Sequence, residues 1–541
     1  MTRYLLAIDQ GTTGSTALVM GIDGRTLGRE SVELPQHFPA PAWVEHDPGE
    51  IADSVERAVS GALRQAGVSG TSIAALGITN QRETTLVWDR ANGRPIARAI
   101  VWQDRRTTDE CQRLRAAGHE PDVRERTGLV LDPYFSATKI AWLLDHHDGA
   151  RARAQAGELA FGTVDSYLIW WLAGGAAARA PHVIEISNAS RTSLMHLGTG
   201  EWDEHLCGLF RVPRAMLPTI VPTTGELART RGFAPLPDGV PITGVAGDQQ
   251  AALFGQACFE PGDAKCTYGT GAFLVVNTGA RRIRSQHGLL STIAWQIAGE
   301  TLYALEGSSF VAGAAVQWLR DGLGIIRSSA EIEALARSVS SSEGVAFVPA
   351  LSGLGAPHWD PGARGLITGL TRGSNKGHIA RATLEAIAFQ IADLVTAIRE
   401  DLALDQRETS SSPEFHGRAG APTRLAPGVA GRMSDARLRV ERIRVDGGAA
   451  QNNLLMQFQS DISDLCIERP LELESTARGA AMLAGVGAGI FASVKQAAQM
   501  VEHPERFDAG MNEAVREEHL TRWRDAVRRT RSGFGLEADV H

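Results

Sequence analysis

A short loop near the start of the chain carries residue types that suit phosphate binding. In LLAIDQGTTGST, residues 5–16, an apolar run ends at Asp9 and is followed by glycines and threonines. Backbone N–H groups and hydroxyls at such a turn can close around phosphate oxygens. A carboxylate cannot hold an anion itself, so Asp9 fits there only with a Mg²⁺ ion between it and the phosphates. The alternative is a plain β-hairpin with turn-forming residues.

Two further stretches offer groups that could grip a polyol. Arg82 and Glu83 directly follow a predicted strand in TNQRETTLVW. A guanidinium donor beside a carboxylate acceptor can bind vicinal hydroxyls, because each hydroxyl both donates and accepts a hydrogen bond. The stretch AIVWQDRRT places Trp102 and Asp104 similarly. The alternatives are charges that point into water and a tryptophan that packs in the core.

Asp248 is a candidate general base. In PITGVAGDQQAALFGQ it follows an apolar strand and a glycine turn and precedes a helical segment. An aspartate in that place is most often a helix N-cap, which contributes about 1 kcal/mol. Phosphoryl transfer, however, needs a carboxylate that positions and deprotonates an attacking hydroxyl. In RIRVDGGAAQNNLL two glycines precede a helix expected to begin near Asn452, which allows either close approach of a flat ligand or a tight turn.

The sequence lacks the motifs that are typical of several other functions. None of the four lysines, Lys139, Lys265, Lys376 and Lys495, follows a glycine, so a Walker-type phosphate loop is excluded. The chain also lacks G-x-G-x-x-G, H-E-x-x-H and G-x-S-x-G. Readings as a dinucleotide oxidoreductase, a zinc protease or an α/β-hydrolase are therefore disfavoured.

Composition indicates an ordinary globular enzyme with more than one domain. The chain has 541 residues, 43% hydrophobic and 21% charged, and a net charge of -8, so it offers no positive field for nucleic acid or anionic membrane. Its five cysteines form no C-x-x-C, which predicts neither disulfides nor a zinc site. The longest apolar run, residues 167–178, is shorter than the roughly 20 residues of a membrane span. With no signal peptide, we expect a cytoplasmic protein.

The predicted elements place the first loop in a sheet. Alternating apolar residues between glycine turns predict strands, and Pro48 and Gly67 fit the start and end of a helix. Such strands followed by helices favour a mixed sheet with helices packed on it. The strands are expected at residues 5–9, 15–20, 26–34, 74–79, 84–89 and 97–102, and the helix at 47–67.

The second half of the chain contains a similar block and one irregular segment. DAKCTYGTGAFLVV, residues 263–276, repeats the order strand, glycine-threonine turn, strand. Hairpins are common enough for chance to explain this, and the other explanation is a pair of similar domains that face each other. Residues 406–438 are rich in Gly, Pro, Ser and Arg and predict a flexible surface insertion. Residues 513–530 predict an amphipathic helix whose charges face solvent.

Together these motifs resemble those of the FGGY carbohydrate kinases. The resemblance covers nearly the whole chain except residues 406–438, with the motifs in the family's order. The matching stretches are AIDQGTTGS, TNQRETTLVWD, VWQDRRT, YFSATKIAWLLDH, GVAGDQQAALFG, TYGTGAF, GLITGLTRGSNKGHIARATLEAIAFQ and VDGGAAQNNLLMQFQSD.

The resemblance implies an α/β protein with a duplicated actin-like (ribonuclease H-like) ATPase fold, in which two domains flank a central cleft. The N-terminal domain, with the polyol and the phosphate and Mg²⁺ side, would span residues 1–252. The C-terminal domain, on the nucleotide side, would span residues 253–541. The implied activity is ATP-dependent phosphorylation of glycerol to sn-glycerol 3-phosphate, by in-line transfer, in glycerol catabolism.

The same resemblance assigns roles to individual residues. Asp248 would be the general base and Asp9 would bind Mg²⁺. The glycerol-binding residues would be Arg82, Glu83, Trp102, Tyr134, Asp248, Gln249 and Phe273. The nucleotide, ATP or ADP, would be held by Thr12, Thr13, Gly14, Thr270, Gly313, Gln317, Gly448 and Asn452.

Two residues of the first loop depart from the family's pattern. Relatives usually read DQGTTSSR where this chain reads DQGTTGST, so Gly14 replaces a serine and Thr16 replaces an arginine that helps to neutralise phosphate charge. No lysine nearby in the sequence substitutes for that arginine. Weaker nucleotide binding or slower turnover is expected unless a distant arginine compensates.

Three alternatives to glycerol phosphorylation stay open. A sister FGGY kinase could act on another polyol or sugar, since pockets discriminate weakly between methylene-scale differences. An actin-like nucleotide switch would phosphorylate no small acceptor and would not need Arg82, Glu83 and Tyr134 beside Asp248. A degenerate paralogue would bind a polyol without catalysis, an alternative that Thr16 supports. The family's assemblies imply a homodimer or a homotetramer.

Overall fold

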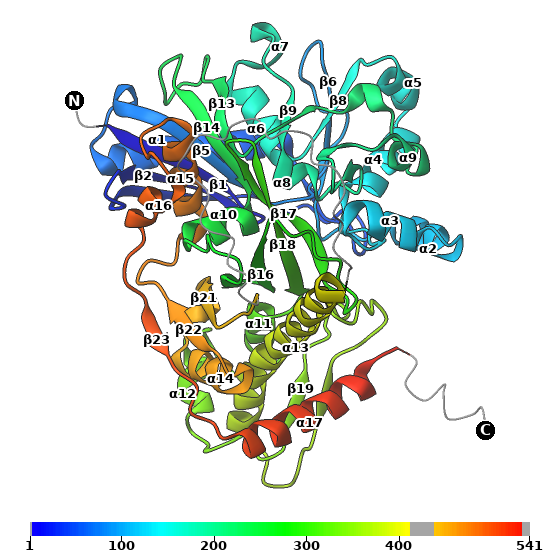
Figure 1. The fold of residues 1–541 in the computed structure, drawn as a ribbon, viewed down its shortest axis with the longest axis vertical. Helices are drawn as coiled ribbons and strands as arrows, with labels where there is room; N and C mark the ends of the chain where they lie inside the picture. The colour runs from blue at the N-terminus through cyan, green and yellow to red at the C-terminus, as the bar shows by residue number, and fades with distance from the viewer. Residues whose placement is uncertain (1–2, 412–437, 533–541) are drawn as a thin grey trace.

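The computed structural model describes residues 3–411 and 438–532, and two large mixed sheets dominate it (Figure 1). The N-terminal sheet has the strand order β13-β14-β5-β1-β2-β3. Its strands are β1 (Tyr4–Gln10), β2 (Gly14–Gly21), β3 (Thr26–Glu33), β5 (Ile73–Asn80), β13 (Thr224–Arg229) and β14 (Pro241–Gly247). The strands predicted at residues 5–9, 15–20, 26–34 and 74–79 are confirmed.

The C-terminal sheet has the order β17-β18-β16-β15-β21-β22-β23. Its strands are β15 (Ala264–Tyr268), β16 (Ala272–Gly279), β17 (Leu290–Ile297), β18 (Glu300–Ser309), β21 (Arg442–Asp446), β22 (Cys466–Arg469) and β23 (Glu505–Phe507). The hairpin predicted from DAKCTYGTGAFLVV is β15 and β16, paired antiparallel.

The two sheets repeat one topology. In the first, β1 pairs antiparallel with β2 and parallel with β5, and β5 pairs parallel with β14. In the second, β15 pairs antiparallel with β16 and parallel with β21, and β21 pairs parallel with β22. The third strand of each unit, β3 or β18, adds antiparallel to the second. The internal repeat is therefore a duplicated domain and not a chance likeness between hairpins.

Helices cover both faces of the N-terminal sheet, which explains why β1 reads as a nearly unbroken apolar run. On one side α1 (Pro48–Ala66) packs against β2 and β3. Asp47 caps its N-terminus and Gly67 ends it in the left-handed conformation, as the sequence predicts. On the other side α15 (Ser475–Gly487) packs against β1, β5 and β14.

Two helices cross in close contact between the sheets. Helix α10 (Asp248–Gly255) packs against α15 through Gly255 and Gly479. A Cβ atom at Gly479 would lie 1.9 Å from the carbonyl oxygen of Ala251, so only glycine permits this approach. Because α10 begins at Asp248, the crossing fixes the position of the predicted base between the two domains.

The remaining elements surround this frame. The short strands are β4 (Glu45–His46), β6 (Leu86–Asp89), β7 (Ala99–Ile100), β8 (Leu159–Gly162), β9 (Val183–Glu185), β10 (Met195–His196), β11 (Glu201–Trp202), β12 (Thr219–Val221), β19 (Ala346–Val348) and β20 (Leu366–Thr368). The N-terminal helices are α2 (Thr108–Ala116), α3 (Glu120–Thr127), α4 (Ser136–His146), α5 (Ala150–Gln155), α6 (Val164–Leu172), α7 (Gly175–Ala178), α8 (Ile186–Ala189) and α9 (Glu204–Leu209). The later ones are α11 (Gly313–Asp321), α12 (Glu331–Ala336), α13 (Lys376–Ser411), α14 (Asn453–Ser463), α16 (Val494–Ala497) and α17 (Glu513–Thr530).

Two local predictions need correction, and the strand expected at residues 84–89 is confirmed. The strand expected at residues 97–102 is only β7, because the backbone N–H of Asp104 turns back onto the carbonyl of Val101. The strand expected at 84–89 is β6, whose ladder partner is β8. The predicted insertion begins too early, since residues 406–411 belong to α13, and residues 412–437 lie outside the described part of the chain.

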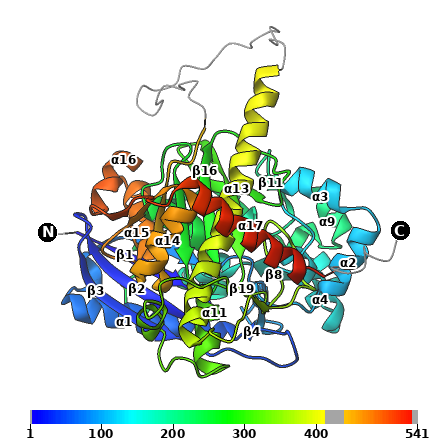
Figure 2. The same cartoon turned by 90° about the horizontal axis from the view of Figure 1, so that it is seen from below.

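Other sequence predictions agree with the structure. Helix α17 has the predicted bounds and crosses in front of α13 in the view of Figure 2. Its Trp523 stacks on Phe389 of α13 with ring centroids 5.2 Å apart. All five cysteines are free. Within residues 3–411 and 438–532, no helix is long and apolar enough to cross a membrane. The domain boundary between residues 252 and 253 stays a prediction.

Candidate functional site

The two glycine-threonine hairpins form corresponding turns of the duplicated domains. Residues 11–13 join β1 to β2, where the Gly11 N–H donates to the Gly14 carbonyl at 2.9 Å. Residues 269–271 join β15 to β16, where the Gly269 N–H donates to the Gly271 carbonyl at 2.9 Å. Trp102 connects the two units. Its indole N–H donates to Thr12 Oγ1 at 2.8 Å, and its ring meets that of Phe273 with centroids 6.1 Å apart.

Asp9, near the end of β1, sits in an acidic environment. Loss of contact with water raises the pKa of Asp9 well above its ordinary value, and the nearby carboxylates of Glu474, Asp248 and Asp446 raise this pKa further. Asp446 is buried, and its Oδ1 has no hydrogen-bond partner among the described residues. Several acidic groups therefore gather near Asp9, although Glu474 pairs with Arg29 and Asp248 pairs with Arg82.

This acidic environment fits a divalent cation. A cation would relieve the repulsion on Asp9 and supply a partner for the unpaired oxygen of Asp446. No group of three or more His, Cys, Asp or Glu side chains among the described residues is arranged to hold a metal ion. Any Mg²⁺ here would therefore keep much of its water shell, as Mg²⁺ commonly does.

Arg82 is the centre of a buried charge network. It follows β5 and is only 2% exposed. Its Nη1 and Nη2 donate to the two carboxylate oxygens of Glu306 at 2.5 and 2.9 Å. Nε lies 3.2 Å from Asp248 Oδ1, and Nη2 also donates to the Tyr134 hydroxyl at 3.3 Å. Because Nε also lies 3.8 Å from Glu83 Oε1, the guanidinium contacts three of the predicted site residues.

Glu83 is held in an unusual backbone conformation. Its φ of 59° lies in the left-handed region, which a residue with a long side chain rarely adopts. The hydroxyls of Ser136 and Thr85 donate to its carbonyl at 2.9 and 3.0 Å, and its buried Oε1 accepts from Arg191 Nε at 2.6 Å. Left-handed non-glycine residues gather at functional sites, where the surrounding structure offsets the strain.

An aromatic cluster lines the same region. Trp102 packs edge-on against Tyr134, with ring centroids 5.6 Å apart, and against Phe273 from the other domain. Tyr134 is buried, and this burial raises the pKa of its hydroxyl. The three rings bring together one apolar surface from both domains beside the polar edge formed by Arg82, which suits a molecule with a carbon backbone and several hydroxyls.

Asp248 is placed to act on a ligand and not to cap its helix. The N-cap of α10 is Gly247, and Asp248 is the first helical residue, with about 30% of its side chain exposed. Its Oδ1 accepts from the Gln249 N–H at 2.7 Å. Within the described ranges no group hydrogen-bonds Oδ2. The carboxylate therefore keeps a free oxygen, as a base that accepts a substrate proton requires.

Five of the predicted nucleotide residues, Thr270, Gly313, Gln317, Gly448 and Asn452, lie in the C-terminal domain. The backbone N–H groups of Ala312 and Ala314 donate to the Thr270 carbonyl, which ties the β15–β16 turn to α11, the helix that carries Gly313 and Gln317. Gly448 lies in the short turn after β21, and Asn452 caps α14 by accepting from the Leu455 N–H at 2.9 Å. Gly313, Gln317, Gly448 and Asn452 are all at least partly exposed.

The packing of a neighbouring strand explains why position 14 is a glycine. The strand β3 passes so close that a Cβ atom at position 14 would lie 2.6 Å from the carbonyl oxygen of Val32. A serine, whose Cβ would take that place, does not fit unless β3 moves. Thr16 pairs with Asp9 across β1 and β2, and its hydroxyl lies 2.9 Å from that of Ser31. An arginine at position 16 would therefore stand beside the Asp9 carboxylate.

We expect Gly14→Ala to lower the free energy of unfolding by about 1–3 kcal/mol, because the added methyl forces two paired strands apart. Gly11→Ala is the matched control, since a Cβ there would lie 3.4 Å from the nearest atom, an ordinary contact. Urea denaturation of both variants compares the two sites. Equal stability of Gly14→Ala and Gly11→Ala would show that β3 can move away from position 14 without a loss of stability.

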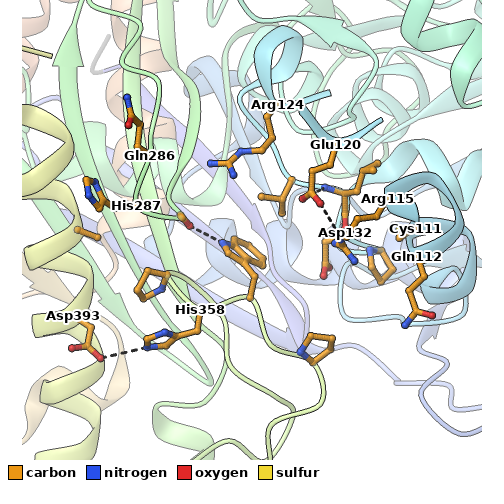
Figure 3. A pocket seen from close by; sticks show the side chains of 18 of the residues that line it. Cys111, Gln112, Arg115, Glu120, Arg124, Asp132, Gln286, His287, His358 and Asp393 are labelled. Carbon is orange, nitrogen blue, oxygen red and sulfur yellow. Dashed lines mark hydrogen bonds and ion pairs between the residues drawn. The ribbon is translucent and has the colours of Figure 1, made fainter. Parts of the chain in front are cut away.

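A cavity of about 760 Å³ adjoins this site without including any of the predicted residues. Arg115 and Arg124 line the wall formed by the N-terminal domain, and His287 and His358 line the facing wall (Figure 3). Its floor includes Trp359, whose indole N–H donates to the Gly288 carbonyl at 2.6 Å. The cavity marks the seam between the domains and lies beside the aromatic cluster, not within it.

Sequence reasoning missed three charged residues of the site. Lys265 is buried and donates to Gln249 Oε1 and, at 2.9 Å, to Thr267 Oγ1. Arg191 and Glu306 belong to the network around Arg82. The signal for Glu306 and Lys265 is a lone charge within a buried strand, in YALEGSS and DAKCTYG, because such a charge needs a partner. A lone charge in a buried strand identifies the residue but does not show which residue it pairs with.

Two duplicated actin-like domains, a glycine-rich hairpin from each, and an acid beside an arginine and three aromatic rings define an actin-like phosphotransferase. The chain belongs to the FGGY family of carbohydrate kinases. The profile of that family's N-terminal domain matches residues 4–255, and the profile of its C-terminal domain matches residues 264–488.

Several individual proteins are similar to this chain along nearly its full length. The chain is 51% identical to a glycerol kinase of Myxococcus xanthus, over 97% of this chain and 99% of that one, and 52% identical to a glycerol kinase of Aromatoleum aromaticum, over 98% and 99%. Its structure is similar to the crystal structure of Plasmodium falciparum glycerol kinase with ADP, with a TM-score of 0.84 and 98% coverage of both chains. The two sequences are 32% identical. A xylulose kinase of Lactobacillus acidophilus has the same fold at 19% identity, with a TM-score of 0.80 and 99% coverage of both chains.

Proposed function

We propose that this protein transfers the γ-phosphoryl group of ATP to glycerol and releases sn-glycerol 3-phosphate and ADP. The observation that carries the proposal is Asp248, about 30% exposed and with one free carboxylate oxygen, next to Arg82 and the aromatic cluster at the seam of the two domains. Support comes from relatives named glycerol kinases that share about half of their residues with this chain along nearly its full length. Glycerol has the carbon backbone and vicinal hydroxyls that this site suits.

On this proposal Trp102 and Phe273 pack on the carbon backbone of glycerol. Its hydroxyls hydrogen-bond with Arg82, Glu83, Tyr134, Asp248 and Gln249. Asp248 Oδ2 accepts the proton of the hydroxyl that attacks the γ-phosphorus. Because in-line transfer needs mainly alignment and charge neutralisation, the rigid placement of Arg82 and Asp248 supplies much of what this chain contributes.

The nucleotide would bind between the two hairpin turns. Thr12, Thr13 and Gly14 would contact phosphate from the first turn, and Thr270 would do so from the second. Gly313, Gln317, Gly448 and Asn452 would hold the remainder of ATP, on surfaces that are partly exposed and so open to a ligand. Thr16 is neutral, but Lys265 donates to Gln249 and lies close to Asp446 and Asp248, whose charges partly offset the lowering of its pKa by burial.

Asp9 would hold Mg²⁺, with Asp248 and Asp446 close by and water completing the coordination. When bound, the ion would neutralise the charge that develops on the phosphates. A cytoplasmic location and a homodimer or homotetramer are proposed from the family resemblance. The net charge of -8 supports the expectation that nucleic acid is not a partner.

The proposal is tested with purified protein, Mg-ATP and a panel of glycerol, xylulose, gluconate and erythritol, with ADP release coupled to a spectrophotometric readout. We expect ADP release that depends on glycerol. Release only with another member of the panel would assign a different acceptor. Release without any acceptor would indicate a nucleotide switch, and glycerol binding with no release would indicate a non-catalytic paralogue.

A further inference from the structure

Glu306 is a charged residue in the middle of a buried strand. It lies on β18 of the C-terminal sheet, between Val275 on β16 and Leu290 on β17. Its side chain is fully buried. A carboxylate is stable in such a place only when positive charge and hydrogen bonds compensate for the loss of water.

The hydrogen bonds that compensate for this burial come from two arginines of the other domain, and the charge of Lys265 on β15 adds to them. Glu306 accepts from both terminal nitrogens of Arg82, and its Oε1 also accepts from Arg191 Nη2 at 2.9 Å. A two-point pairing of this kind fixes the plane of the guanidinium and not only its distance. Burial alone would raise the pKa of Glu306, but Arg191 and Arg82 outweigh burial and lower it to about 2, so the group is ionised at neutral pH.

The pairing leaves Arg82 one orientation. With its terminal nitrogens turned toward Glu306, its Nε lies 3.2 Å from Asp248 and its Nη2 reaches the Tyr134 hydroxyl at 3.3 Å. Arg191 completes the network, because it also pairs with Glu83 at 2.6 Å. The network thus joins two guanidinium groups to the carboxylates of Glu83, Asp248 and Glu306, and Glu306 alone of these residues comes from the C-terminal sheet.

We propose that Glu306 is a positioning residue for the polyol site: from the C-terminal sheet it sets the orientation of Arg82, and through Arg82 that of Asp248 and Tyr134. The site that binds the acceptor in the N-terminal domain is therefore complete only when the C-terminal domain is in place. This inference rests on the proposed function, since it assumes that the acceptor lies against Arg82 and Asp248.

Glu306→Gln tests the inference, because glutamine keeps the shape of the side chain and removes its charge. We expect the KM for glycerol, and the Kd for glycerol measured by calorimetry without nucleotide, to rise by at least ~10-fold, since displacement of a positioned group by about 1 Å can cost as much as ~100-fold. The KM for ATP should change by less than ~3-fold, because Glu306 contacts none of the predicted nucleotide residues. A purely structural role would lower stability and leave both glycerol constants unchanged.

Glu385→Gln is the matched control. Glu385 is a buried carboxylate of α13 that pairs with Arg381 at 2.8 Å, away from the cleft. Its loss should leave the glycerol constants unchanged. If Glu306→Gln matched Glu385→Gln in these constants, the inference would be overturned.

Two further variants keep the test decisive if Glu306→Gln does not fold. The double variant Arg191→Gln with Glu306→Gln removes one charge of each sign, and we expect it to fold with weakened glycerol binding. Glu306→Asp keeps the charge but shortens the reach, and we expect it to be stable with a raised glycerol KM. Normal glycerol binding in both variants would refute the positioning role. Wild-type protein that binds no glycerol would instead refute the proposed function.

Discussion

Asp248→Asn should lower the turnover number for glycerol phosphorylation by at least ~100-fold while the fold and glycerol binding persist. Asparagine keeps the size of the side chain but cannot accept the proton of the attacking hydroxyl. In the structure only one carboxylate oxygen of Asp248 is engaged by the protein, which leaves the other for the substrate. Steady-state kinetics and glycerol calorimetry on the same preparation separate turnover from binding.

The control for this variant is Asp203→Asn. Asp203 caps α9 and pairs with Arg126 at 2.9 Å, so it also combines a helix start with an arginine partner. Its loss should reduce stability slightly and leave turnover within ~2-fold of wild type. Near wild-type turnover in Asp248→Asn would remove this residue from the role of base.

Arg82→Met should lower the free energy of unfolding by about 3–5 kcal/mol, because it leaves buried carboxylates without their counter-charge. Glu306 loses two hydrogen bonds, Asp248 loses its arginine partner, and the Tyr134 hydroxyl loses the hydrogen bond from Arg82. Glycerol-dependent activity should also fall in Arg82→Met. Urea denaturation gives the stability change, and the coupled ADP assay gives the activity.

An exposed ion pair provides the comparison for Arg82→Met. Arg113 pairs with Glu110 at 2.7 Å on α2, and 59% of the Arg113 side chain is exposed. Because water and salt screen such a pair, Arg113→Met should change the unfolding free energy by no more than ~0.5 kcal/mol. Equal losses in the two variants would mean that the buried network around Arg82 contributes no more than a surface pair.

Local patterns in the sequence were sufficient to predict the frame of the molecule. The apolar run that ends at Asp9, the glycine-threonine turn and its repeat at residues 263–276 are the two equivalent hairpins of the duplicated sheets. Helix α1 begins after Asp47 and ends at Gly67 because capping depends on residues next to the helix. The strand expected at residues 97–102 is shortened to β7, since a turn at Asp104 competes with strand pairing there.

Pairings between distant residues could not be predicted in this way. The sequence identifies Arg82 and Glu83 as adjacent opposite charges, and they were expected to act together on a polyol. In the structure the two charges lie 3.8 Å apart, but Arg82 hydrogen-bonds with Glu306 and Glu83 with Arg191, each more than 100 positions away. Nothing in the local spacing encodes these partners, because they depend on how the two domains meet.

The most direct test of the account is the product itself. Wild-type protein is incubated with Mg-ATP and glycerol, and glycerol 3-phosphate and ADP are quantified together by ³¹P nuclear magnetic resonance. We predict that the two products form in equal amounts and that both disappear when glycerol is left out. ADP that accumulates without glycerol 3-phosphate would contradict the assignment of glycerol as the acceptor.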